Sequence, residues 1–193
     1  MDEGGGAFYG PKIDCKVQDG AGRWLQCASV QLDFQVPRRL ALKYVGAAGE
    51  ARVPVMIHRA VLGSIEGMFA VLSEHYRGRW PFWLSPRQAL LVPVNAADDA
   101  QCAAVGQLHR ELRAEGFAVD LDVSRRDMRE KIKEACGASQ GGELWRYNCV
   151  LLVGSRELAA GSISLRMAGE ARSRSVPLAS LGPLFAEMGA LPA

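Results

Sequence analysis

The sequence lacks the cysteine pattern of a disulfide scaffold or a zinc knuckle. Its five cysteines are odd in number and contain no CxxC pair. Isolated cysteines among apolar residues are usually small core residues of proteins kept in a reducing compartment. We therefore expect free thiols and a reducing intracellular location, either the cytoplasm or the interior of an organelle such as a mitochondrion or plastid. The cysteines are Cys15, Cys27, Cys102, Cys136 and Cys149.

Two further absences narrow the class of protein. No apolar run approaches the roughly 20 residues that span a bilayer, so we expect no membrane insertion. The acidic and then glycine-rich start, MDEGGGAFYGPK, is typical of neither a signal peptide nor a transit peptide. The 23 basic residues are nearly balanced by 21 acidic ones, for a net charge of +2. RNA binding would therefore need a local surface, because the chain as a whole is not a polycation.

The length of 193 residues suits one large or two small domains, and the 49% hydrophobic content suits a packed core. Residues 1–57 have strand patterns: KIDCKVQD and RWLQCASVQLDFQV alternate apolar and polar residues around a DGAG turn. The second segment predicts a face with three polar side chains, which suits either the floor of a site or a polar surface covered by another chain. Strict alternation places Trp24, Gln26, Ala28, Val30, Leu32 and Phe34 on one face and Leu25, Cys27, Ser29, Gln31 and Asp33 on the other.

The segment HRAVLGSIEGMF, residues 58–69, has apolar residues at helical spacing after a short strand, VPVMI. It predicts a helix over about 58–76 that packs its apolar stripe under the sheet. The segment WPFWLSPRQ follows and indicates a linker, so we expect a domain boundary near residue 85. Its aromatic residues Trp80, Phe82 and Trp83 favour a core at the domain junction over a base-stacking platform.

From residue 88 onward, strand and helix patterns alternate. Three buried strands are predicted at ALLVPV, FAVDLDV and NCVLLVG, with helices between them, two short strands at SISLRM and SRSVPL, and a closing helix. Asn95 or Asp98 is the expected cap of the first helix, and Ser124 that of the second. This order predicts an α/β domain with a mixed, mostly parallel five-stranded sheet. Residues 138–148 are longer than an ordinary helix-to-strand loop and indicate an insertion.

Several of these segments, taken in order, resemble the C-terminal part of threonyl-tRNA synthetases, which are class II aminoacyl-tRNA synthetases. The resemblance implies an α+β chain: residues 1–85 as the last part of the antiparallel catalytic core and 86–193 as the α/β anticodon-binding domain. It also implies a role in protein biosynthesis with tRNA as partner. The matching segments are FYGPKID, QCASVQLDF, VPVMIHRAVLGSIE, WPFWLSPRQ and VGSRELAAGSISLR.

The resemblance also implies roles for individual residues. Tyr9 and Gln31 would line the threonine pocket, and His58 would be one of three protein ligands to a zinc ion. The nucleotide would lie near Lys12, Gln26, Ser29 and Ser64, where Ser29 replaces a more usual threonine. Anticodon bases would be read by Lys133, Glu157 and Arg166, where Lys133 replaces a more usual arginine.

The most consequential departure from the family pattern is Gly67, which stands where class II motif 3 has an arginine. That arginine supplies fixed positive charge to nucleotide phosphates, which glycine cannot do. The resemblance places the other two zinc ligands and the motif 2 arginine in a part of the core that this sequence does not include. A catalytic zinc takes about three protein ligands, so we expect no cofactor in this chain alone, and ATP and zinc only where the rest of the core is supplied. His58 would then be a half-buried, hydrogen-bonded histidine.

Two functions remain open. The chain is either the RNA-binding C-terminal part of an enzyme that attaches threonine to tRNA-Thr, not catalytic on its own, or an inactive paralogue. The paralogue would serve as a structural or RNA-binding subunit of a ribonucleoprotein such as an organellar ribosome. An incomplete core predicts a protein partner or larger assembly that covers it. Two sets of charges also stay open: those at 125–131 form either a solvated helix face or an RNA contact, and Glu157 and Arg166 either read RNA or form a cross-strand salt bridge.

Overall fold

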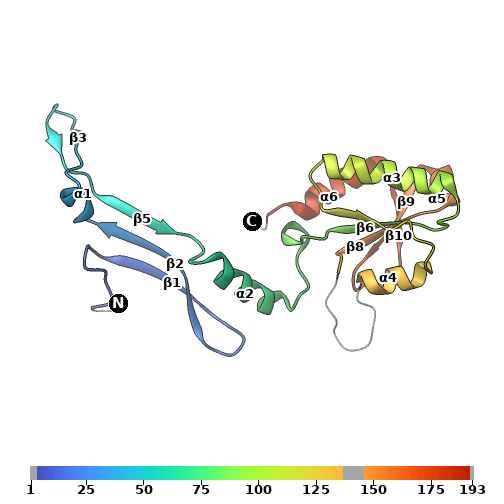
Figure 1. Ribbon diagram of the computed structural model, residues 1–193, viewed down its shortest axis with the longest axis horizontal. Coiled ribbons are helices and arrows are strands. Elements are labelled where there is room, and N and C mark those ends of the chain that lie inside the picture. Colours follow the sequence, from blue (N-terminus) through green and yellow to red (C-terminus); the bar gives the residue numbers. More distant parts are fainter. Residues whose placement is uncertain (1–3, 137–145, 192–193) are drawn as a thin grey trace. The chain divides into compact units, whose positions relative to one another are not determined.

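The computed structural model describes residues 4–136 and 146–191 and divides the chain into two compact units, 1–75 and 76–193 (Figure 1). The first unit is built on a three-stranded antiparallel sheet in the order β1-β2-β5. Its first two strands, β1 (Lys12–Gln18) and β2 (Trp24–Asp33), lie where the alternating pattern predicts them. The turn between them is closed by Asp19, whose carboxylate accepts the backbone N–H groups of Ala21 and Arg23 at 3.0 and 2.8 Å.

A β-bulge in β2 changes which face one predicted site residue occupies. The register runs from Cys15 opposite Ala28 to Lys16 opposite Gln26, so β2 contains one extra residue at this point. The Gln26 side chain therefore lies on the same face as Ser29 and Gln31, where its Nε2 donates to Asp14 Oδ1 at 2.9 Å. The prediction from strict alternation, which put Gln26 on the opposite face, is wrong because a bulge resets the two-residue period.

The segment after β2 also differs from its prediction. Residues 56–60 form strand β5 (Met56–Ala60), and the helix α2 begins only at Ile65 (Ile65–Tyr76). His58 is thus a strand residue, directly opposite Gln31. The predicted packing of an apolar stripe under the sheet is wrong as well: α2 has no buried residue, and Ile65 and Phe69 are 77% and 63% exposed. Pairing with β2 satisfies the backbone of 56–60, and this long-range gain outweighs the local helical spacing.

Between β2 and β5 the chain forms a short helix, α1 (Val36–Arg39), and a small hairpin of β3 (Tyr44–Val45) and β4 (Ala51–Arg52). The helix ends in a left-handed residue, Ala41, at φ 50°. The N–H of Ala41 bonds to the carbonyl of Arg38, and that of Leu42 to the carbonyl of Pro37, at 3.1 and 2.9 Å. This pair of bonds is a Schellman motif, which usually has glycine at the left-handed position.

The second unit contains the expected mixed five-stranded sheet, in the order β10-β9-β8-β6-β7. Three neighbouring strands run parallel: β7 (Val119–Leu121), β6 (Ala89–Pro93) and β8 (Cys149–Val153). Strands β9 (Ser162–Met167) and β10 (Arg174–Pro177) continue the sheet antiparallel. Every residue of β6 and β8 is buried, as expected of strands covered on both faces.

Helices cover the two faces of this sheet (Figure 1). One core packs under α3 (Asp99–Ala114) and α6 (Leu181–Gly189), and it includes Phe82 of the short 3-10 helix η1 (Phe82–Leu84). Phe82 meets Phe185 edge-on at 4.9 Å between ring centroids, so this aromatic residue belongs to the core of the second unit. A second core packs under α4 (Met128–Cys136) on the other face.

The caps refine the predicted helix starts. Asp98 caps α3 by accepting the N–H groups of Ala100 and Gln101. The second predicted cap is wrong: Asp127, not Ser124, accepts the N–H groups at the start of α4, from Arg129 at 2.8 Å and Glu130 at 3.3 Å. Helix α5 (Ser155–Ala160) was not predicted, and the 3-10 helix η2 (Leu178–Ser180) precedes α6. Most of the insertion predicted at 138–148 lies outside the described residues, and no described helix is long and apolar enough to cross a membrane.

Candidate functional site

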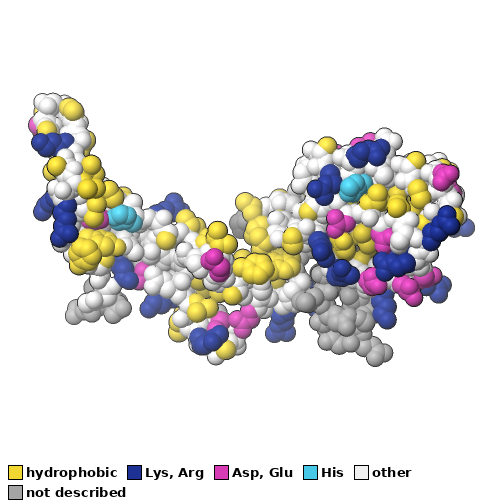
Figure 2. All heavy atoms as spheres, viewed as in Figure 1, with side chains coloured by type: hydrophobic (Ala, Val, Ile, Leu, Met, Phe, Trp, Pro, Cys, Tyr) yellow, Lys and Arg dark blue, Asp and Glu magenta, His cyan; other side chains and the backbone are white. Residues whose placement is uncertain are grey.

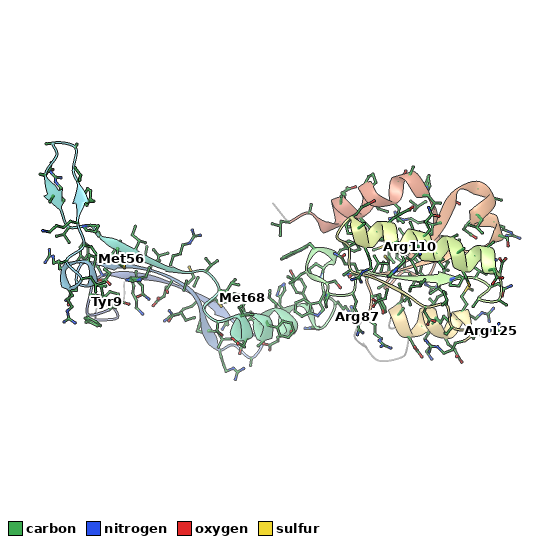
Figure 3. All side chains as sticks on the ribbon, turned by 45° about the horizontal axis from the view of Figure 1, so that its top comes forward. Tyr9, Met56, Met68, Arg87, Arg110 and Arg125 are labelled. Atoms are coloured by element: carbon green, nitrogen blue, oxygen red, sulfur yellow. The ribbon has the colours of Figure 1, made fainter. Side chains whose placement is uncertain are left out.

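The polar face of the first sheet brings together several of the predicted site residues. Gln31 lies directly opposite Lys12 on one side and His58 on the other, so these three side chains form a row across the strands. The Tyr9 hydroxyl donates to Gln31 Oε1, and Gln31 Nε2 donates to Ser29 Oγ at 3.3 Å. The Tyr9 and His58 rings lie 5.8 Å apart. Figure 3 shows Tyr9 at the end of the sheet where Met56 lies, away from Met68 on α2.

Gly10 explains why Tyr9 can reach this row. A Cβ atom at residue 10 would lie 2.2 Å from the carbonyl oxygen of Leu32, so no other residue allows this close approach. The approach lets the N–H groups of Leu32 and Phe34 bond to the carbonyls of Pro11 and Tyr9 at 3.0 and 3.1 Å. The FYGPK segment therefore lies flat along β2 and presents the Tyr9 ring to the polar face.

Asp33 holds His58 in place. The two side chains are joined by a 2.9 Å hydrogen bond between His58 Nε2 and Asp33 Oδ2, and the carboxylate is 1% exposed against 44% for the histidine. Desolvation acts to raise the pKa of Asp33, but hydrogen bonds from His58, Val36 N–H and Gln35 N–H outweigh it and hold that pKa below its usual value. His58 therefore has a hydrogen-bond partner, as expected, but it is exposed and not half-buried.

The donors around His58 do not fit a zinc ion by themselves. Within the described ranges, 4–136 and 146–191, no three histidine, cysteine, aspartate or glutamate side chains lie close enough to hold a metal ion. The nearby carboxylate of Asp33 is already engaged by three hydrogen-bond donors. A protein zinc site needs about three or four ligands, so this unit supplies one histidine and its orienting carboxylate but not a complete site.

The residues expected near a nucleotide lie further along the same face. Asp14 stands opposite Ser29 and organises this part: its carboxylate pairs with Lys12 Nζ at 2.7 Å and accepts from Gln26 Nε2 at 2.9 Å. Lys12 and Gln26 are therefore adjacent through Asp14, a residue that the sequence analysis did not single out. The sequence did not reveal this contact because it depends on the bulge in β2, which turns the Gln26 side chain toward the Asp14 carboxylate.

Ser64 and Gly67 lie at the start of α2. The Ser64 hydroxyl accepts the N–H of Gly67 at 3.0 Å and so acts as the N-cap of this helix. A Cβ at residue 67 would meet only Ser64 Oγ, at 3.0 Å. The space beyond Gly67 is otherwise open, so the packing around this position does not require glycine.

In the second unit the three expected anticodon residues lie on three different elements. Lys133 is exposed on α4, whereas Arg166 is partly buried on β9, where its Nε atom has no hydrogen-bond partner in the described structure. Burial raises the pKa of the nearby Cys136 thiol, and the positive charge of Arg166 opposes that rise. Glu157 lies on α5 and accepts the N–H of Gly154 at 3.0 Å. No ion pair joins Glu157 to Arg166 among the described side chains, so the cross-strand salt bridge is not formed.

A polar pocket of about 370 Å³ lies beside α4 and was missed in the sequence. Its central contact is a 2.7 Å hydrogen bond from the Tyr147 hydroxyl to Asp120 Oδ2, and the Arg87 guanidinium lies 6.0 Å from the Tyr147 ring centroid. Burial, with the hydrogen bond to Asp120 and its charge, raises the pKa of Tyr147 to about 12. The lining residues are Leu90, Asp120, Leu121, Asp122, Arg126, Lys131, Glu134, Ala135, Arg146 and Tyr147.

The wall of this pocket is a charged network centred on Asp122. Arg126 bridges Asp122 and Glu134 at 3.0 Å each, so part of the basic run at 125–131 is engaged within the protein. Lys131 is 2% exposed, and its Nζ lies 3.2 Å from Asp122 Oδ1. Desolvation acts to raise the pKa of Asp122, but hydrogen bonds from Ser124, Arg126 and Lys131 lower it well below its usual value. The carboxylate is therefore charged at neutral pH, and the pocket offers both donors and acceptors.

Comparisons with known proteins match both units. Residues 2–76 match the tRNA synthetase class II core domain (G, H, P, S and T), and residues 88–188 match the anticodon binding domain. The chain is 45% identical over 188 residues to a probable cytoplasmic threonine–tRNA ligase of Arabidopsis thaliana, covering 97% of this chain and 39% of that protein. It is 47% identical over 169 residues to mitochondrial threonine–tRNA ligase 1 of the same plant, covering 86% of this chain and 22% of that one.

A solved structure supports the same assignment. The crystal structure of the RNA binding domain of threonyl-tRNA synthetase from Cryptosporidium parvum Iowa II superposes with a TM-score of 0.82 at 38% identity, covering 96% of this chain and 44% of that one. The chain thus spans less than half the length of each of these relatives. The chain therefore belongs to the class II tRNA synthetases with an anticodon binding domain: it carries a fragment of the class II core followed by that domain, and its relatives over most of its length are threonine–tRNA ligases.

Proposed function

We propose that this chain binds tRNA through its anticodon-binding unit, as part of a protein that attaches threonine to tRNA-Thr, and that it does not activate threonine on its own. The observation that carries the proposal is the polar pocket beside α4, within the unit that matches the anticodon binding domain. Carboxylates, guanidinium groups and a tyrosine ring line it together. Proteins read RNA loops by hydrogen bonds to the edges of splayed bases and by stacking, and this lining can do both.

The first test is binding of a tRNA-Thr anticodon stem-loop, measured by filter binding at low salt against a random-sequence hairpin of equal length. Arg146→Gln and Lys133→Gln, on the α4 side, are expected to weaken binding by roughly fivefold to a hundredfold if they contact bases. Arg110→Gln is the matched control, because Arg110 is exposed on α3, which covers the opposite face (Figure 3). Equal affinity for both hairpins, or equal effects of all three variants, would contradict the proposal.

The absence of threonine activation rests on two features of the first unit. Gly67 supplies no charge for nucleotide phosphates, and His58 has no set of co-ligands in the described structure. We expect no threonine-dependent exchange of pyrophosphate into ATP by the purified chain. Gly67→Arg, for which the space is open, is expected to fold and still not restore exchange, because the metal ligands remain incomplete. Threonine-dependent pyrophosphate exchange above background by the unmodified chain would refute this part of the proposal.

The substitution at Gly67 also favours a second candidate, a catalytically inactive paralogue that serves in a ribonucleoprotein such as an organellar ribosome. Both candidates need a partner that covers the face of the first sheet opposite the polar row. On that face Ile13, Val30 and Ile57 are 70%, 39% and 64% exposed. Copurification separates the two: the synthetase reading expects tRNA-Thr and the rest of a synthetase core, in the cytoplasm or an organelle, whereas the paralogue expects stable ribosomal association without charging activity.

A further inference from the structure

The second unit has another pocket, on the α3 side of its sheet. The volume of this pocket is about 380 Å³, which lies in the usual range for small-molecule sites. It is enclosed by α3, α5, η2 and the adjoining ends of β8 and β9, and we name it the α3–α5 pocket. Helices α3 and α5 lie side by side at this place (Figure 1). The lining is aliphatic except for Gln107, Glu111 and Ser162.

The floor and walls of the α3–α5 pocket are apolar. Val153 is 4% exposed and Leu108 packs against the same core, so the floor is continuous with the core under α3. Leu158 of α5 and Leu178 of η2 are 36% and 39% exposed and line the more open part. Covering concave apolar surface with hydrocarbon is favourable because it removes that surface from water. The pocket therefore favours a ligand with a compact hydrocarbon body.

Glu111 gives this pocket a negative edge. Its Oε1 accepts a hydrogen bond from Gln107 Nε2 at 2.9 Å, and no ion pair engages its carboxylate in the described part of the chain. Arg113, two residues further along α3, donates instead to the carbonyl of Val119 at 3.4 Å. Glu111 is exposed, so it keeps its charge and part of its hydration. A cationic group placed here would gain a charge-assisted hydrogen bond with little loss of solvation.

The charge of the lining separates this pocket from the one beside α4. Figure 2 shows Lys and Arg side chains gathered around α4, and Arg126, Lys131 and Arg146 line the pocket there. Among the described residues, no Lys, Arg or His lines the α3–α5 pocket. A carboxylate without a neighbouring cation repels phosphate groups, so RNA is not the ligand that this lining fits.

We propose that the α3–α5 pocket binds a small organic cation, an ammonium group carried on a branched or cyclic hydrocarbon body. The hydrocarbon lies against Leu108, Leu158 and Leu178, and the ammonium group donates to the Glu111 carboxylate at the edge. The site is separate from the pocket beside α4, and the inference does not depend on the binding of RNA.

The first test compares a cation with its neutral isostere. The probes are cyclohexylmethylamine and cyclohexylmethanol, titrated into the full chain and followed by ligand-observed NMR. A Kd of about 1 mM is expected for the amine, given its size. The amine should bind about twofold to fivefold more tightly than the alcohol, because its partner is an exposed carboxylate. Glu111→Gln should abolish this preference, whereas Glu130→Gln, which changes an exposed carboxylate on α4, should preserve it.

The second test locates the bound probe. In methyl spectra of leucine-labelled protein, the signals of Leu108, Leu158 and Leu178 should move during the titration with the amine. The signals of Leu90 and Leu152, which belong to the core under α4, should stay in place.

A third test fills the pocket. Ala104→Leu places extra side-chain volume in it and should weaken the binding of amine and alcohol alike by about tenfold or more. Ala103→Leu is the matched control, because Ala103 is exposed at the next position of α3 and does not line the pocket. Circular dichroism establishes that the variants are folded. Glu111→Gln decides the question if Ala104→Leu does not fold, because Glu111 is exposed.

Three results would overturn the inference: equal affinity for the amine and the alcohol, a preference for the amine that survives Glu111→Gln, or shifts confined to leucines outside the α3–α5 pocket. Changes in the signals of Leu158 and Leu178 with protein concentration, in the absence of a probe, would show that a second copy of the chain fills the pocket. That result would overturn the inference as well.

Discussion

Replacement of Lys131 tests whether the buried network beside α4 stabilises the second unit. Lys131 Nζ donates to the carbonyls of Asp122 and Ser124 at 3.1 and 2.5 Å and pairs with Asp122 Oδ1 at 3.2 Å, while its side chain is 1% exposed. Lys131→Met keeps most of the apolar stem and removes all three contacts. Asp122 keeps Arg126 and the N–H of Ser124, so the main loss is two charge-assisted hydrogen bonds to carbonyls.

At about 1.5 kcal/mol for each such bond, Lys131→Met is expected to lower the free energy of unfolding of this unit by about 3 kcal/mol. Lys133→Met is the matched control, because Lys133 is exposed on the same helix and its change is expected to stay within about 0.5 kcal/mol. A loss of about 3 kcal/mol corresponds to a shift of about 1–3 M in the urea midpoint for a small domain.

The assay must report on the second unit alone, and Cys149 provides the signal, because it is 0% exposed and lies on β8. Pulse labelling with a maleimide across a urea series, read by mass spectrometry of the peptide that contains Cys149, gives the midpoint. The pKa of Asp122 is lowered in the folded state, so its ion pair contributes above the unfolded pKa of about 3.9 and is lost below it. The two variants should differ equally at pH 7 and 5. Most of the difference should persist below pH 4, because the two carbonyl bonds of Lys131 do not titrate, and only the smaller part due to the Asp122 ion pair should decline as the pH falls toward the lowered folded pKa. A difference under about 1 kcal/mol at pH 7 would refute the reasoning.

Three other predictions follow from single features. Ala41→Gly is expected to stabilise the first unit by about 0.5–1 kcal/mol, since glycine relieves the left-handed strain at φ 50°. A urea series with maleimide labelling, read at the peptide that contains the buried Cys27 of β2, measures this change, and Ala47→Gly in the exposed hairpin turn is the control. A pH jump followed at 295 nm should show a tyrosinate component with a midpoint of about 12, and Tyr147→Phe should remove it. The Tyr147 hydroxyl contributes to stability below the unfolded pKa of about 10, and this contribution is lost as the pH rises toward 12. Brief maleimide labelling of the native protein should modify the exposed Cys15 first and leave Cys149 unmodified, because Cys149 is buried and burial strongly raises the pKa of its thiol. Labelling in the reverse order would contradict the described burial.

The sequence predicted those elements whose signals are local. Continuous apolar runs identified β6 and β8, and alternation identified β1 and β2, because burial on two faces or on one leaves a direct trace in residue order. The family could also be recognised from the sequence, since segments such as FYGPKID and VGSRELAAGSISLR occur in the family's order along the chain. Tyr9, Gln31, Ser29 and His58 follow from those segments, and the structure brings them onto one face.

Only the tertiary structure decided the remaining features, and in each case the cause is a contact between residues far apart in sequence. Pairing with β2 made 56–60 a strand despite helical spacing, and the bulge opposite Cys15 turned Gln26 onto the site face. Lys131 appeared to belong to a solvated charge run, yet the carbonyls of the loop before α4 bury it. The sequence by itself therefore determined the family, the principal strands and helices and the candidate residues. The fold decided their neighbours, because register, burial and charge pairing depend on which distant segments meet.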